Sequence, residues 1–324
     1  MEPPSPAGKT LTLLADRSHA GKRLDAALSG LFPGYSRSAL ARAVKSGLVL
    51  VDGLPARPST RVRAGQRIDF TPPGTPGAAP LPAPGIPLRI LHEDASIIVV
   101  DKQPGLAVHP GAGTPGPTLA GAVLALHPEL SSVGDPARPG IVHRLDKDTS
   151  GIIVMARTRE ALESLREAFA GRLARKRYLA FAKGLPPLTG RIDSPVSRHP
   201  ARRHRMAAGL PGGRQALTTW RVLRSFPATG VSLLSMQLHT GRTHQARVHL
   251  ASAGFPVLGD PLYGPGQKAF LKAFPSLAAL VGRQLLHARR LSIPHPAGGR
   301  ASYAAPWPED FVAVCRELAR LETA

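Results

Sequence analysis

The segment GIVHRLDKDTSG, residues 140–151, places two carboxylates, two cations and an imidazole in one short run between apolar segments. Asp146 stands just before the apolar run GIIVMA, so a turn at the end of a buried strand would hold its carboxylate at the edge of a sheet. A carboxylate placed there can act as a nucleophile or as a general base. Turn residues and Arg–Asp pairs are also common on surfaces, so this run alone leaves catalysis open.

The same carboxylates are compatible with two other chemistries. Asp146 and Asp148 would be the nucleophile and the acid of a retaining glycosidase if their carboxyl groups stood about 5 Å apart. Metal binding is disfavoured, because the flanking Arg144 and Lys147 oppose the recruitment of a cation. A second polar segment, LHTGRTHQARVHL, has histidines five residues apart, which is poor spacing for shared metal ligation on a helix.

Strand-like segments surround both motifs. Helical patterns predict a helix that begins after Thr158, another at roughly 243–253 and a last one after Pro308. Many strands with hairpin-length connections favour an α+β domain on a mainly antiparallel mixed sheet over a repeating βαβ arrangement. Apolar runs with the length of strands occur at 88–91, 97–100, 152–155, 178–182, 218–223 and 231–238.

A proline-rich segment separates this region from the N-terminus. Residues 71–87 contain seven Pro and three Gly, a composition that cannot sustain a helix or a central strand and behaves as an extended spacer. Upstream, the apolar spacing predicts two short helices followed by short strands, which is a small α+β module. We therefore expect a small basic domain at 1–70, a linker at 71–87 and a larger domain at 88–324.

Positive charge is concentrated in two stretches. Residues 1–70 hold 11 Lys and Arg against 5 Asp and Glu, and residues 195–258 have no acidic residue at all. Such one-signed stretches suit a phosphate-binding surface, although solvated surface charge or a loop that orders only on RNA binding would give the same pattern. The cations that we expect to contact RNA in these stretches are Arg37, Arg42, Lys45, Arg202, Arg203 and Arg247.

The whole chain of 324 residues carries a formal charge of +21, which favours a polyanionic partner. A membrane is the weakest candidate, because no apolar run approaches the length that crosses a bilayer and the first ten residues lack the apolar core of a signal peptide. Cys315 is the single cysteine, which excludes an internal disulfide and a thiolate zinc cluster within one chain. We expect a cytoplasmic protein, with a monomer as the default.

Five separated motifs resemble those of RluA-type pseudouridine synthases and occur in the order found in that family. The similarity covers residues 88–315, and the N-terminal part resembles the small alpha-L RNA-binding module named after a bacterial small-subunit ribosomal protein. That attachment is found in the RluC-like and RluD-like branch of the family. The motifs are GIVHRLDKDTSGIIVMAR, KRYLAFAKG, LHTGRTHQARVHL, GDPLYG and LLHARRLSIPHP.

This resemblance implies an enzyme that isomerises uridine in structured RNA, by detaching the base from its nitrogen link, rotating it and rejoining it through carbon. It implies no cofactor and no metal. Asp146 would be the indispensable carboxylate, either attacking the anomeric carbon or removing a neighbouring sugar proton. Arg242 would pair with Asp146 and favour its charged form. Tyr178 would stack on the uracil and assist proton removal at carbon 5.

The resemblance also implies RNA contacts around the pocket. Arg144 would fill the space left by a flipped uridine, His143 would contact the RNA backbone, and Lys102 would lie on a loop near the pocket. The chain departs from the family at two positions. Gln103 stands where proline usually follows the lysine, which affects the lysine loop, and Ala246 replaces a typical isoleucine, which removes apolar packing from a helix.

The leading hypothesis is an RNA pseudouridine synthase that acts on large-subunit ribosomal RNA. One alternative is a non-catalytic factor that assembles ribosomal RNA through its cationic surfaces, and another is a pseudouridine synthase that acts on transfer RNA. A glycosidase would release free base, but that reading leaves the +21 charge and the N-terminal module without a purpose.

Overall fold

The computed structural model describes residues 10–32, 37–71, 79–111, 116–202, 204–264 and 266–323, with the backbone alone for Ser38 and Ala39. Two compact units form, residues 1–86 with 109–139 and residues 87–108 with 140–324. Residues 72–78 of the expected linker lie outside the described residues, as do 1–9 and 33–36 of the expected N-terminal domain. The division at 1–70, 71–87 and 88–324 therefore stays a prediction.

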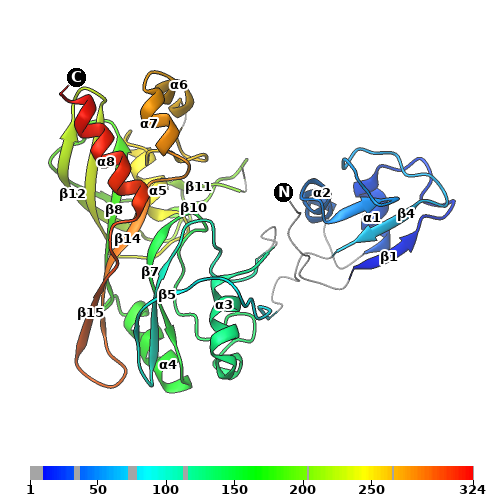
Figure 1. Ribbon diagram of the computed structural model, residues 1–324, viewed down its shortest axis with the longest axis horizontal. Helices are drawn as coiled ribbons and strands as arrows, with labels where there is room; N and C mark the ends of the chain where they lie inside the picture. Colours follow the sequence, from blue (N-terminus) through cyan, green and yellow to red (C-terminus); the bar gives the residue numbers. More distant parts are fainter. Residues whose placement is uncertain are drawn as a thin grey trace. The chain divides into compact units, whose positions relative to one another are not determined.

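Two helices and an antiparallel sheet form the N-terminal part of the first unit (Figure 1). Leu24 and Leu28 of the first helix and Leu40 of the second are fully buried in one cluster with Ile68 and Phe70 of the last strand. The sheet order is β1-β4-β2-β3. The elements are α1 (Leu24–Leu31), α2 (Arg37–Lys45), β1 (Leu11–Leu14), β2 (Val49–Val51), β3 (Leu54–Pro55) and β4 (Arg67–Phe70). The predicted helix pair and the strands after it are present, and β1 is an addition.

The first unit also contains α3 (Leu119–Leu126) and the 3-10 helix η1 (Pro128–Ser132). The side chain of Thr118 caps α3 by accepting a hydrogen bond from the amide of Gly121. A side chain at Gly121 would collide with the backbone carbonyl of Leu81, so glycine is required for this close approach. The amide of Ala83 donates to the Gly121 carbonyl at 2.9 Å, which ties the chain at this point to α3.

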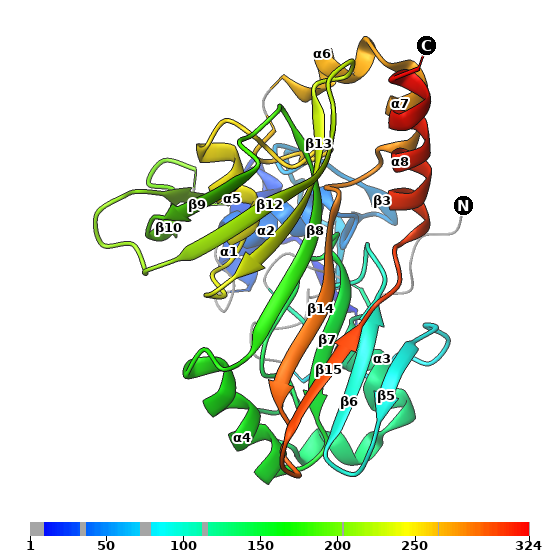
Figure 2. The same cartoon turned by 90° about the vertical axis from the view of Figure 1, so that its left-hand side faces the viewer.

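A nine-stranded sheet is the framework of the second unit (Figure 2). Its order is β5-β6-β7-β14-β8-β13-β12-β9, with β15 paired to β14. Among these pairs only β7 and β14 run parallel in the described residues, so the predicted mainly antiparallel α+β fold is confirmed. The strands are β5 (Arg89–Glu93), β6 (Ile97–Lys102), β7 (Ser150–Ala156), β8 (Arg175–Lys183), β9 (Thr189–Asp193), β12 (Leu217–Phe226), β13 (Val231–Leu238), β14 (Leu286–Pro294) and β15 (Arg300–Ala304).

Helices and one separate hairpin complete the second unit. Figure 2 shows α4 at one end of the sheet and α6, α7 and α8 at the other. The helices that were predicted after Thr158 and Pro308 and at 243–253 are present, as α4, α8 and α5. No helix in the described ranges is both long and apolar enough to cross a membrane. The elements are α4 (Arg159–Ala170), α5 (Gln245–Ser252), α6 (Gln267–Lys272), α7 (Pro275–Leu280), α8 (Glu309–Leu321), β10 (Val196–Arg198) and β11 (Met206–Ala208).

The parallel pair β7 and β14 brings together the segments that build the site. β7 is apolar and buried along its whole length, as expected for a strand that is covered on both faces. Gly151 in β7 has a φ of +109°, and a side chain there would collide with the backbone of Ala288 in β14. Glycine therefore permits this pairing, which sets the loop before β14 beside the turn that precedes β7.

Candidate active site

Asp146 lies in a turn directly before β7. The amide of Thr149 donates to the carbonyl of Asp146 at 3.1 Å and closes this turn. The Asp146 side chain is 16% exposed, although the strand that follows is fully buried. A rigid scaffold thus holds the carboxylate at a sheet edge within reach of a ligand, which agrees with the prediction from sequence.

Lys102, at the end of β6, holds the Asp146 turn from one side. Its side chain is completely buried, and Nζ donates to the carbonyls of Gln103, Leu106 and Lys147, each at 2.9 Å. Three carbonyls match the three donors of an ammonium group, while burial lowers the pKa of Lys102 to about 7. The expected contact between Lys102 and RNA is therefore wrong, because no part of this side chain reaches the surface.

Arg283, in the segment before β14, holds the same turn from the other side. Its Nη1 donates to the carbonyl of Asp148 at 2.8 Å, and its Nη2 donates to Oγ of Ser150 at 3.1 Å. The guanidinium is itself anchored on the carboxylate of Asp310 in α8, with hydrogen bonds of 2.6 and 3.1 Å. Because a guanidinium presents its donors in one rigid plane, this residue locks the turn to two other elements.

Arg247 on α5 forms the ion pair with Asp146. Its Nη1 lies 3.0 Å from Oδ2 of Asp146, and its Nε and Nη2 bind both oxygens of Asp260 at 2.7 and 2.9 Å. The side chain of Arg247 is 4% exposed and that of Asp260 is fully buried. Burial lowers the pKa of Arg247, but the two carboxylates raise it by more, so the net direction is upward. Asp260 thus orients a permanent positive charge toward Asp146.

Arg242, the predicted partner of Asp146, makes a different contact. Its Nε donates to the carbonyl of Gln215 at 3.0 Å, and in the described residues no ion pair joins it to Asp146. Burial and the charges of Arg214 and Arg172 lower the pKa of Arg242. The physical reason for the correction is that Arg247, in the first turn of the buried helix α5, reaches the Asp146 carboxylate, whereas Arg242 on the turn before α5 contacts the Gln215 carbonyl.

Arg247 is buried, although the sequence prediction placed it on the surface. It was expected on an RNA-binding surface, but residues 245–250 of α5 are all buried, so this arginine projects into the protein. The buried position of Ala246 in the same helix agrees with the packing role predicted for it. Arg247 therefore makes the contact with Asp146 that was predicted for Arg242.

Tyr178 lies in the middle of β8, opposite Met236 of β13 and Ala288 of β14. Its side chain is buried, with 7% exposed. Burial, and then the negative charge of Asp146, raise the pKa of Tyr178. The phenol therefore shares the site with the carboxylate and stays protonated at neutral pH.

The two residues before Leu145 differ in their surroundings. Arg144 is exposed, which is compatible with the predicted insertion into RNA. The ring of His143 stacks on Phe169 with 4.6 Å between centroids, and its Nε2 accepts a hydrogen bond from the amide of Val154 at 3.0 Å. Burial, with a smaller effect of Lys176, lowers the pKa of His143 to about 3. This neutral ring supports β7, and because the side chain is partly exposed, its expected contact with the RNA backbone stays a prediction.

The hairpin of β10 and β11 carries the basic segment RHPARRHRM in part of its strands and in the loop between them. Arg202 is exposed, as a phosphate-binding residue must be. Arg203, for which the same role was predicted, lies outside the described residues.

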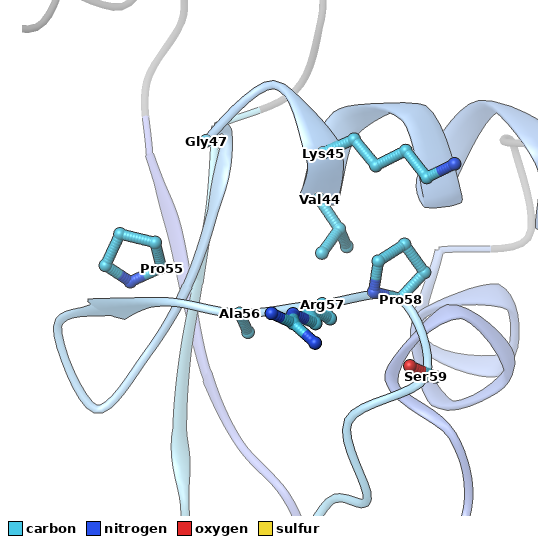
Figure 3. Close-up of a pocket in the computed structure, with 8 residues that line it drawn as sticks. All are labelled: Val44, Lys45, Gly47, Pro55, Ala56, Arg57, Pro58 and Ser59. Atoms are coloured by element: carbon cyan, nitrogen blue, oxygen red, sulfur yellow. The ribbon is translucent and has the colours of Figure 1, made fainter.

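In the N-terminal part, Arg37, Arg42 and Lys45 are all exposed on α2. Arg37 is partly engaged, because its Nη2 lies 3.2 Å from Oδ1 of Asp25. An open hollow of about 530 Å³ lies beside the end of this helix. Figure 3 shows Lys45 at the helix end, Val44 pointing into the hollow, and Arg57 on the loop opposite.

One group of potential metal ligands occurs in the described part of the chain, away from Asp146 in sequence. It consists of His92, Asp94 and His295, whose ligand atoms lie within 4.8 Å of one another. Hydrogen bonds account for it, because Nε2 of each histidine lies 2.7 or 3.0 Å from Oδ2 of the aspartate. The amide of Ala297 donates to Nδ1 of His295 at 3.2 Å, so in the neutral ring Nε2 carries the proton and cannot bind a metal.

Three residues of the site were not predicted: Asp260, Arg283 and His244. A signal for Asp260 was present, because it is the first acidic residue after the basic stretch 195–258 and a buried arginine there needs a carboxylate partner. Arg283 had no comparable signal, since the charge of an arginine does not reveal its burial. His244 faces Oδ1 of Asp146 with its Nε2 at 3.9 Å.

Two segments of the chain match known protein families. Residues 96–252 match the family described as RNA pseudouridylate synthase, and residues 22–68 match the S4 domain.

Curated relatives and solved structures are similar over most of the chain. A ribosomal large subunit pseudouridine synthase D of Xanthomonas campestris pv. campestris is 44% identical over 91% of this chain and 88% of that protein. An uncharacterized RNA pseudouridine synthase of Chloroflexus aurantiacus is 45% identical over 93% of this chain and 91% of that protein. The structure of human RNA pseudouridylate synthase domain containing 4 matches with a TM-score of 0.56 and 27% identity, over 71% of this chain and 93% of that one.

Proposed function

The chain belongs to the RNA pseudouridylate synthase family, and we propose that it converts uridine to pseudouridine in large-subunit ribosomal RNA. Membership makes it an isomerase with an N-terminal S4 domain. The ribosomal target is supported by the names of its relatives, several of which are ribosomal large subunit pseudouridine synthases D. The glycosidase and the purely structural assembly factor are correspondingly disfavoured.

The observation that carries this function is the Asp146 carboxylate, partly exposed at a sheet edge and held 3.0 Å from a buried guanidinium. In the reaction the bond between N1 of uracil and C1′ of the sugar breaks and a bond between C5 and C1′ forms, while the hydrogen on C5 leaves as a proton and N1 gains one. Asp146 either attacks C1′ or removes the neighbouring sugar proton, and each route requires a carboxylate. Arg247 supplies the fixed positive charge that supports it.

Tyr178 supports two steps at different stages. In the resting enzyme it is a neutral phenol, because burial and the charge of Asp146 raise its pKa, so it contacts the uracil through its ring and hydroxyl. When Asp146 is esterified or protonated during the reaction, the electrostatic contribution that raises this pKa disappears. The phenol then loses its proton more readily, and the phenolate that results can accept the C5 proton, which is the role predicted for it.

Arg242 takes a place on the RNA-binding surface. Burial and then the charge of Arg242 lower the pKa of Lys176 to about 8, and Arg214 and Arg172 act on Arg242 in the same direction. Cations that destabilise one another in this way are stabilised by an anion between them. We assign this cluster of Arg242, Lys176, Arg214 and Arg172 to the backbone phosphates of the substrate, and Arg144 to the space left by the flipped base.

The S4 domain provides a second surface for contact with RNA. Its hollow combines an apolar wall at Val44, Pro55 and Pro58 with the cations Lys45 and Arg57, for which the described residues contain no ion-pair partner. An apolar surface for a base beside cations for phosphates is the arrangement that binds unpaired RNA.

Replacing Lys45 and Arg57 together with Gln should weaken binding to a ribosomal RNA fragment about tenfold at moderate salt and reduce the salt slope by about 2. The rate at saturating RNA should not change. Fluorescence anisotropy over a salt series measures both quantities. The matched control is Lys268→Gln with Lys272→Gln on α6, which removes the same charge. An equal loss of affinity in the two double variants would show that only total charge matters.

The target is tested by mapping pseudouridine in cells with and without the gene. Ribosomal RNA is treated with a carbodiimide that labels pseudouridine, and primer-extension stops are located. We expect stops in large-subunit RNA that depend on the protein and return with wild type but not with Asp146→Asn. Stops that change only in transfer RNA would establish the transfer-RNA alternative. A pattern that is unchanged in every RNA would exclude the enzyme function in this cell.

Localisation, oligomeric state and cofactor use complete the proposed function. We place the enzyme in the cytoplasm with its ribosomal substrate, with a monomer as the default. We expect no metal or cofactor, because the proposed steps use only a carboxylate, a phenol and fixed cations.

A further inference from the structure

His244 is aimed at the second oxygen of the Asp146 carboxylate. Its Nε2 lies 3.9 Å from Oδ1, whereas Arg247 occupies Oδ2. The Nδ1 atom of the same ring lies 2.8 Å from the hydroxyl of Tyr263, which belongs to the GDPLYG motif. The imidazole thus stands between that tyrosine and Asp146.

The hydrogen bonds of Tyr263 determine which ring nitrogen of His244 carries the proton. The amide of Met206 in β11 donates to the Tyr263 oxygen at 2.7 Å, so the hydroxyl must direct its own proton to another acceptor. In the described part of the chain, Nδ1 of His244 is that acceptor. Burial lowers the pKa of His244 more than the charge of Asp146 raises it, which favours the neutral ring. With Nδ1 accepting, Nε2 carries the proton and faces Asp146 as a donor.

The backbone of His244 is held in a left-handed conformation, which is uncommon for residues other than glycine. Its φ is +55° in the left-handed region, immediately before α5. This conformation costs free energy for most residues with a side chain, although asparagine, aspartate and histidine adopt it more often than the others. Residues that persist in such conformations occur preferentially where the side chain has a function. The left-handed backbone of His244 and the position of its Nε2 near Asp146 are independent observations on one residue.

We propose that His244 is a positioning residue for the reaction, whose Nε2–H donates to Oδ1 of Asp146 when RNA is bound. The inference rests on the proposed function. A movement of roughly 1 Å converts the present separation into a hydrogen bond. Arg247 and His244 then hold the two carboxylate oxygens, which stops the carboxylate from rotating and directs it at the reacting sugar atom. Tyr263 acts through His244 by keeping the donor on the correct nitrogen.

The kinetic test compares His244→Asn and His244→Gln with wild type. A large-subunit ribosomal RNA transcript containing 5-tritiated uridine releases its label to water as C5 bonds to C1′. At saturating RNA we expect His244→Asn to lower the single-turnover rate about 10- to 100-fold without changing RNA affinity. His244→Gln should recover part of the rate, because its amide can place an N–H donor near the position of Nε2.

Thermal unfolding separates positioning from a structural role. Asn tolerates a positive φ at least as well as His, so the Tm of His244→Asn should match that of wild type while its rate falls. The tautomer is tested without any assay of activity, by ¹⁵N NMR of labelled wild type and Tyr263→Phe. The wild-type ring should carry its proton on Nε2, and loss of the Tyr263 hydroxyl should shift the population toward Nδ1.

The possible results distinguish failure of the positioning role of His244 from failure of the synthase function. A wild-type rate in His244→Asn, or a fall in Tm that parallels the loss of rate, would overturn the positioning role and leave the synthase function standing. A wild-type ring protonated on Nδ1 would overturn it as well. If wild type itself releases no tritium from any RNA, the proposed function fails and the inference fails with it.

Discussion

Asp146→Asn should lower the rate of pseudouridine formation by about 10⁴-fold or more, with RNA affinity and fold unchanged. An amide keeps the size of the side chain and still accepts a hydrogen bond from Arg247, but it can neither attack C1′ nor remove a sugar proton. Stability should change little, because Arg247 retains both of its hydrogen bonds to Asp260. Tritium release at saturating RNA, RNA binding and thermal unfolding measure the three quantities.

The matched control is Asp148→Asn, two residues along the same turn. The carbonyl of Asp148 holds the turn to Arg283, and that bond survives a change of side chain. We therefore expect Asp148→Asn to keep most of the activity. A glycosidase with Asp146 and Asp148 as its paired carboxylates would lose activity in both variants and would release free uracil. Full activity in Asp146→Asn would refute the assignment of the catalytic carboxylate.

Substitutions of Arg247 and Arg242 should affect different quantities, the rate of the chemical step and the affinity for RNA, although both residues lie in one motif. Arg247→Gln removes the charge beside Asp146, and we expect the rate at saturating RNA to fall about 10²- to 10³-fold. Arg242→Gln removes a surface cation, so RNA affinity should fall severalfold and the salt slope by about 1, with the saturating rate nearly unchanged. Single-turnover rates and binding isotherms on both variants provide the comparison.

Folding must be controlled in this comparison, because breaking a buried ion pair by removing one partner costs about 3–5 kcal/mol. Arg247→Gln leaves the fully buried carboxylate of Asp260 without its partner. The double variant Arg247→Gln with Asp260→Asn removes both charges, so it should regain stability and stay inactive. Recovery of activity along with stability would mean that Arg247 has only a structural role. If Arg242→Gln rather than Arg247→Gln lost the chemical step, the pairing of Arg242 with Asp146 that the sequence predicts would be supported instead.

Much of the fold could be predicted because its signals are local. The apolar run of β7, the cap at Thr158 and the helix after Pro308 each depend on neighbouring residues, and all appear in the structure. The order and register of the sheet could not be predicted. β7 pairs with β14 more than a hundred residues later, and that pairing depends on the close approach of backbones at Gly151.

The ordered motifs of the sequence predicted the class of chemistry, which the family match supports, and they named Asp146 as the candidate carboxylate, because Asp146, its turn and the strand after it are contiguous. The sequence by itself also predicted the polyanionic partner, since net charge is a sum over residues. Only the tertiary structure decided what each cation does. Lys102 and Arg247 are buried beside the turn, whereas Arg242 lies near other cations. A lysine or arginine has the same charge in either place, and only the packing of distant elements removes it from water and supplies the carbonyl or carboxylate that it must then contact.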